Sequence, residues 1–207
     1  MSSYLLPLAT IAGLYMVAVA SPGPNFFLIS QFAVTSRKRL AVLVALGITM
    51  GSFTWALMAM YGIATLLARI DWLYATIRLA GAAYLIWFGI RLLRTSARPQ
   101  TDAPRPSGPM NSAQALRTGL LTSLTNPKSG AFWVSVFAST FPADAPAWLY
   151  AVTSAIIALL SSIWHIGIAL VFTNERVQVG YRRLRRPLDA LCGAALVAFG
   201  CRLAATR

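Results

Sequence analysis

The chain has 207 residues, of which 57% are hydrophobic and only 11% are charged. A soluble domain carries roughly 45–50% apolar and 25% charged residues, so this composition excludes an ordinary soluble protein and indicates an integral membrane protein. A net charge of +13 would suit a nucleic-acid-binding domain. Here, however, the basic residues occupy short connectors between apolar runs, and we expect no nucleic-acid partner.

Apolar runs long enough to cross a bilayer recur along the chain. A hydrocarbon core about 30 Å thick needs about 20 apolar residues of helix, and residues 40–68 exceed that length without one charged side chain. The sequence therefore predicts an all-α integral membrane protein that has the lipid bilayer as its main partner. We predict six transmembrane helices, at residues 5–34, 40–68, 72–93, 115–141, 147–173 and 188–204.

A polar segment divides the chain into two halves. Residues 95–112 contain four prolines among polar side chains, which is typical of a flexible linker. We therefore predict a first three-helix repeat at residues 1–94, a cytoplasmic proline-rich linker at residues 95–112, and a second three-helix repeat at residues 113–207.

Basic residues cluster in alternate connectors, and connectors rich in Lys and Arg stay in the cytoplasm. This rule predicts that the N-terminus and the C-terminus both lie outside the cell, although Arg202 and Arg207 near the C-terminus argue against it. The three clusters are Arg37, Lys38 and Arg39; Arg91, Arg94, Arg98, Arg105 and Arg117; and Arg176, Arg182, Arg183, Arg185 and Arg186.

The two halves resemble one another. The third predicted helix contains GAAYLIWFG at residues 81–89, and the sixth contains GAALVAFG at residues 193–200. Ser52 and Trp55 in the second helix are similarly matched by Ser161 and Trp164 in the fifth. Because each half has an odd number of crossings, a duplication would give two inverted repeats, which is a frequent plan among secondary transporters.

Proline interrupts the first and the fourth predicted helices. The first break has the sequence SPGPN at residues 21–25, and the second has TNPKS at residues 125–129. Proline removes a backbone donor and clashes with a preceding carbonyl group, so a continuous helix is not expected at either place. Both breaks lie well inside the bilayer, where irregular backbone is tolerated only if protein or water covers it. We expect the two breaks to meet near the midplane.

Two such breaks can bind a zwitterion. The N-terminus of a half-helix directs N–H groups at an anion, and carbonyl groups freed upstream of a proline can hold an ammonium group. The alternative, that the prolines only shape helix packing, stays open. The candidate substrate-binding residues are Pro22, Gly23, Pro24, Asn25, Asn126, Pro127 and Lys128.

Two titratable residues are candidates for proton coupling. Lys128 lies deep in the fourth helix, where a charge costs a few kcal/mol, although it could also snorkel toward the interface. His165 is the sole histidine and can exchange protons near neutral pH, or it can serve as a hydrogen-bonded packing residue. The sequence contains no catalytic or metal-binding motif, so we expect no enzyme activity, cofactor or metal.

Two further features concern packing. Asp189 follows the third basic cluster, and we expect it to pair with arginines of that cluster. Gly47 and Gly51 are four residues apart and predict close contact with another helix. Whether that helix belongs to this chain or to a second copy in a homo-oligomer is open.

Taken together, the segments at residues 21–25, 81–89 and 117–129 resemble the LysE/RhtB family of bacterial amino-acid exporters. The resemblance implies export of amino acids across the bacterial inner membrane, coupled to the proton motive force, by a protein of about six helices that can form oligomers. Many relatives carry an acidic residue where Ser161 stands here. Without that carboxylate a dibasic solute lacks a partner, so we favour neutral amino acids or their derivatives. The alternative is a membrane scaffold without transport activity.

Overall fold

The computed structural model describes residues 2–21, 23–34, 38–67, 71–96, 110–142 and 145–205. All regular secondary structure within these ranges is helical, which confirms the predicted all-α class. The eight helices are α1 (Ser2–Ala20), α2 (Pro24–Val34), α3 (Lys38–Leu67), α4 (Asp71–Ser96), α5 (Ser112–Leu124), α6 (Pro127–Thr140), α7 (Ala147–Val171) and α8 (Glu175–Ala205).

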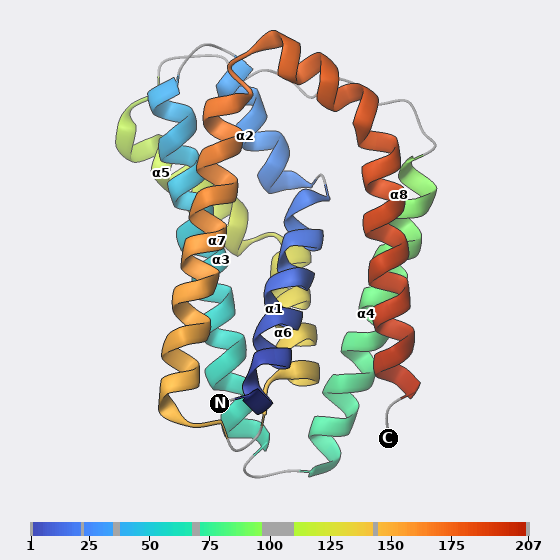
Figure 1. Cartoon of the computed structure of the whole chain (residues 1–207). Coiled ribbons are helices and arrows are strands. Elements are labelled where there is room, and N and C mark those ends of the chain that lie inside the picture. Colours follow the sequence, from blue (N-terminus) through green and yellow to red (C-terminus); the bar gives the residue numbers. More distant parts are fainter. Residues whose placement is uncertain are drawn as a thin grey trace.

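The helices form two groups with the broken ones between them (Figure 1). Helices α3, α5 and α7 pack together on one side, and α4 packs along α8 on the other, while α1, α2 and α6 lie between. Both chain termini lie at the same end of the molecule (Figure 1). At the opposite end α2, α4 and α7 finish and α3, α5 and α8 begin. We call it the basic end, because Lys38, Arg39, Arg94 and Arg176 belong to these helix ends.

Three helices of the described part of the chain are long and apolar enough to cross a membrane, and their spans are Lys38–Gly62, Ala147–Val171 and Arg183–Ala205. Helices α1 and α2, which are bent by 55° at their break, make a fourth if they form one span. The other two predicted crossings, at residues 72–93 and 115–141, correspond to α4 and to α5 with α6. The count of six crossings stays a prediction.

Both proline breaks separate two helices rather than bend one. Helix α1 ends at Ala20 and α2 begins at Pro24, while α5 ends at Leu124 and α6 begins at Pro127. Proline suits the first position of a helix because the N–H group that it lacks would have no helical partner there. Pro24 and Pro127 therefore each start a new helix at a place where the sequence predicted an interruption.

Helix α8 differs from the prediction at its start. The sixth helix was expected at residues 188–204, after a basic connector, but α8 already begins at Glu175. The side-chain oxygen of Asn174 accepts a hydrogen bond from the Arg176 backbone N–H at 2.9 Å and thereby caps the start of α8. The Arg, Glu and Gln residues that follow favour the helical conformation. Pro187 lies inside α8, and the helix changes direction along its length (Figure 1).

Glycine permits close packing of α3 against α5 within this chain. A Cβ atom on Gly47 would collide with the carbonyl oxygen of Leu116, and one on Gly119 would collide with that of Val44. Gly51 similarly faces Ser123. The partner of the Gly47–Gly51 face is therefore α5 of the same chain, which answers the question that the sequence left open.

We predict that Gly119→Ala lowers the thermal unfolding temperature of the purified protein in detergent. The added methyl group has no space beside Val44, and overpacking costs about 1–3 kcal/mol. Gly167→Ala in α7 is the matched control, because a Cβ there meets no atom within 4 Å. Equal melting temperatures for the two variants would contradict the close packing of α3 and α5.

Candidate functional site

A small cavity with both polar and apolar lining residues lies between the two breaks. Its volume is about 50 Å³, which is room for about four water molecules at the roughly 10–15 Å³ that each needs. The cavity is lined by residues of α1, α2, α3, α6 and α7 and of both breaks. Its polar lining includes Ser21, Asn25, Ser52, Asn126, Lys128 and His165.

A pair of amide side chains joins the two breaks. The Nδ2 atom of Asn126 donates a hydrogen bond to Oδ1 of Asn25 at 3.1 Å, across 101 positions of sequence. The Oδ1 atom of Asn126 accepts from the backbone N–H of Lys128 at 3.0 Å and thereby caps α6. Asn126 is only 5% exposed. One buried side chain thus starts α6 and attaches it to the first residues of α2.

Lys128 extends from the second break to the first. Its Nζ atom donates to the Ser21 carbonyl oxygen at 2.9 Å and contacts Ser21 Oγ at 3.2 Å. The ammonium group also lies 4.9 Å from the ring centroid of Phe88 on α4. A Cβ atom on Gly23 would lie 3.4 Å from Nζ, so the glycine leaves room for the lysine. The side chain therefore points into the protein and does not snorkel to the basic end.

Each break has a backbone carbonyl group that accepts a hydrogen bond from a side chain of another segment. The Ser21 carbonyl accepts from Lys128, and the Leu124 carbonyl accepts from the indole Nε1 of Trp55 at 3.2 Å. Carbonyl groups at such a depth cannot rely on bulk water, so these donors stabilise the irregular backbone. A solute that binds the Ser21 carbonyl must first displace the lysine ammonium.

His165 belongs to the wall of the cavity on α7. It is 4% exposed, and its Nδ1 atom lies 3.2 Å from Ser161 Oγ and 3.3 Å from Thr49 Oγ1. Because two hydroxyl groups surround one ring nitrogen, the tautomer decides which atoms donate. The histidine is thus both hydrogen-bonded and part of the cavity lining.

Aromatic residues that the sequence analysis did not select form much of the remaining wall. Tyr15 stacks on Trp133 with ring centroids 4.9 Å apart, and the Ser52 hydroxyl lies 3.4 Å from both Tyr15 Oη and Trp133 Nε1. Phe26 and Trp164 also line the cavity. The only signal in the sequence was the match of Ser52 and Trp55 with Ser161 and Trp164.

The other predicted residues lie elsewhere. Pro22 falls outside the described residues. Pro24 and Pro127 begin α2 and α6 without lining the cavity, so they shape the breaks. Asp189 pairs with Arg185, as predicted, with 3.4 Å between Oδ2 and Nε. Asp189 is 1% exposed, so this carboxylate is buried within the protein.

Broken helices around a central cavity between membrane-crossing helices are typical of secondary transporters. The comparison with known families agrees with this class. The chain belongs to the LysE type translocator family, whose model matches residues 16–207, and it is a multi-pass membrane transport protein.

Curated relatives cover nearly the whole chain. It is 36% identical over 205 residues to the threonine efflux protein of Salmonella typhimurium, covering 96% of this chain and 97% of the relative. It is 34% identical over 209 residues to the threonine efflux protein of Escherichia coli, covering 98% and 100%. It is also 31% identical over 191 residues to the uncharacterized membrane protein YahN of Escherichia coli, covering 92% and 86%. No solved structure matches the chain.

We predict that the contact between Asn25 and Asn126 is energetically coupled. In a double-mutant cycle with Asn25→Ala and Asn126→Ala, the two stability losses should be non-additive by about 1 kcal/mol, the usual net value of a buried hydrogen bond. Unfolding of the purified variants in detergent measures the cycle. Pairing Asn25→Ala with Gly167→Ala provides the control, since these residues share no contact and their effects should add. Additivity in both cycles would show that the amide pair contributes nothing.

Proposed function

We propose that the chain is a secondary transporter that exports small neutral amino acids, threonine among them, across the bacterial inner membrane. The observation that carries this proposal is the cavity in which Lys128, the Asn25–Asn126 pair and the Ser21 carbonyl meet. The names of the two threonine efflux relatives support the class of solute and the direction of transport. Transport of this kind requires no catalytic residue and no cofactor.

The groups around the cavity match the two charges of an amino acid. The solute carboxylate binds the ammonium of Lys128, which then leaves the Ser21 carbonyl. The freed carbonyl oxygen and Oδ1 of Asn25 accept hydrogen bonds from the solute ammonium. Both half-helix N-termini lie beside this position and favour the carboxylate. The solute thus replaces the contact that holds the breaks together when the cavity is empty.

Charge and size favour a small neutral side chain. The described residues that line the cavity include the cation Lys128 and no carboxylate, so a second ammonium group on the solute would be buried without a partner. The volume of about 50 Å³ requires the aromatic walls to move even for a small amino acid. A compact solute needs less movement than a large one, and Ser52 offers a hydroxyl partner to a solute that carries a hydroxyl group.

Contacts between α4 and α8 support the proposal of two inverted repeats. A Cβ atom on Gly89 would lie 2.6 Å from the Gly193 carbonyl oxygen, and one on Gly200 would lie 3.0 Å from the Ala82 carbonyl oxygen. In the repeat alignment Gly89 matches Gly200 and Gly81 matches Gly193, so the first contact corresponds to one between Gly200 and Gly81, one residue away from the Ala82 contact. With the basic end in the cytoplasm, the proposed arrangement has six crossings, both termini outside, and one site that opens alternately to either side.

We predict that Lys128→Met lowers threonine export by at least about tenfold, since a hydrogen-bonded charge contributes about 1.5–3 kcal/mol to binding. Export is measured as release of labelled threonine from cells whose membranes contain equal amounts of each variant. Lys38→Met is the matched control, because Lys38 is exposed at the start of α3, and it should leave export unchanged.

Purified wild-type protein in liposomes gives the second test. If it moves no amino acid under any ion or solute gradient, the transport proposal fails and the membrane-scaffold alternative gains. If the wild-type protein transports threonine but Lys128→Met does so equally well, the proposed site is wrong while the function stands.

We also propose that His165 couples export to the proton motive force. We predict that His165→Gln keeps the exchange of labelled for unlabelled threonine across liposomes but loses accumulation driven by a pH gradient. The amide can still bond to Ser161 and Thr49, whereas it cannot carry a proton near neutral pH. Full gradient-driven accumulation in this variant would remove His165 from the coupling mechanism.

A further inference from the structure

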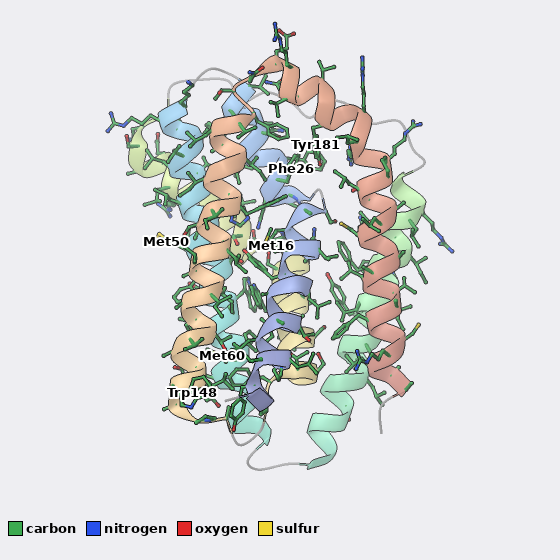
Figure 2. All side chains as sticks on the ribbon, viewed as in Figure 1. Met16, Phe26, Met50, Met60, Trp148 and Tyr181 are labelled. Carbon is green, nitrogen blue, oxygen red and sulfur yellow. The ribbon has the colours of Figure 1, made fainter. Side chains whose placement is uncertain are left out.

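A stripe of polar side chains on α8 faces α2 outside the cavity. Tyr181, Arg185 and Asp189 are spaced four residues apart and therefore lie on one face of the helix. The Tyr181 ring lies 4.7 Å from the Phe26 ring, and the Arg185 guanidinium lies 5.3 Å from the centroid of the Phe27 ring. Figure 2 shows Phe26 and Tyr181 together between α2 and α8. We call these three residues the α8 stripe.

The α8 stripe is incompletely paired, although Asp189 is buried and Tyr181 and Arg185 are half-buried. Within the described part of the chain, five buried side-chain polar atoms have no hydrogen-bond partner, and three of them are Tyr181 Oη, Arg185 Nε and Asp189 Oδ1. Arg185 Nε nevertheless makes the 3.4 Å ion pair with Asp189 Oδ2, so Tyr181 Oη and Asp189 Oδ1 are the two stripe atoms with neither a hydrogen bond nor an ion-pair contact. A buried polar atom without a partner costs about 1–3 kcal/mol, and folded proteins contain few. Such a concentration on one helix face indicates a binding surface for a polar ligand.

The α8 stripe connects the basic end with the cavity. Tyr181 lies in the first part of α8, near the basic end, and contacts Phe26, which lines the cavity. At the other end of the stripe, Asp189 interacts electrostatically with Lys128, which also lines the cavity. The stripe therefore lies next to residues of the cavity lining at both of its ends.

We propose that the α8 stripe is an entry site that binds the zwitterion of an amino acid before it reaches the cavity. The Arg185 guanidinium binds the solute carboxylate, the Tyr181 hydroxyl donates to the same carboxylate, and Asp189 binds the solute ammonium. A fixed pair of opposite charges suits a zwitterion, because each charge of the solute meets its opposite in the pair. This inference rests on the proposed function and assigns a second binding position to the same solute.

A purely structural ion pair is the competing explanation, since Arg185 and Asp189 flank Pro187 and could hold the bend of α8. The two explanations differ when both charges are removed. Replacing one partner leaves the other charge buried alone, which is destabilising. Replacing both partners leaves no uncompensated buried charge and is often neutral for stability. A structural pair is therefore rescued in the double variant, but a zwitterion site is not.

The experiment measures the concentration dependence of threonine uptake into inside-out membrane vesicles, which expose the basic end to the medium. The variants are Arg185→Gln, Asp189→Asn and the double variant, with Arg183→Gln as the matched control, because Arg183 is an exposed arginine of the same helix. We expect the KM for threonine to rise about tenfold or more in all three test variants, since each loses a charge-assisted contact, and to stay unchanged in the control.

Each other outcome overturns the inference in a recognisable way. A wild-type KM in the double variant would show that the Arg185–Asp189 ion pair only stabilises the bend of α8. Wild-type KM values in all three test variants would also overturn the entry site. If a single variant does not elute as a folded protein in gel filtration, the double variant and Tyr181→Phe, which keeps the ion pair, still provide the KM comparison. Absence of threonine transport by the wild-type protein would end the proposed function and this inference together. Normal wild-type transport with unchanged variants would end this inference alone.

Discussion

A carbonyl group that loses its helical partner inside a bilayer has no bulk water to bond with, and this constraint organises the centre of the molecule. Both proline breaks free such groups, and side chains from distant segments reach them: Lys128 bonds to Ser21, and Trp55 bonds to Leu124. The amide of Asn126 completes the arrangement by capping α6 and contacting Asn25. The groups that stabilise the irregular backbone are therefore the same groups that surround the cavity.

Local patterns in the sequence predicted the breaks and their proximity, but not their partners. Proline has a direct effect on the backbone, and the basic clusters predicted similar depths for both breaks, which agrees with the contact between Asn25 and Asn126. The donor Trp55 comes from another helix, and nothing local marks a tertiary partner. The α8 extension was missed because its arginines were interpreted as a connector, although arginine also favours helix.

Glycine determines which helices stay together. Gly47 and Gly119 bring α3 and α5 into backbone contact, and Gly89 and Gly193 do the same for α4 and α8. Contacts of this kind leave no side chain that could rotate to absorb a shift, so each pair is expected to move as one body. The broken helices lie between the two pairs (Figure 1), where the hydrogen bond between Asn25 and Asn126 and that between Lys128 and Ser21 join the two breaks. In the proposed transport cycle, rearrangement would concentrate at these bonds while the glycine-packed pairs keep their shape.

The aromatic wall of the cavity also gives the protein a built-in optical probe. Trp133 and Trp164 border the same small space, and the Trp133 indole N–H lies against Ser52. Indole emission depends on the polarity and hydrogen bonding around the ring, and both change when a charged solute replaces water. The unlabelled protein therefore carries fluorescent indole groups beside the proposed solute site. Its intrinsic fluorescence can follow the binding and release of a solute during a single turnover.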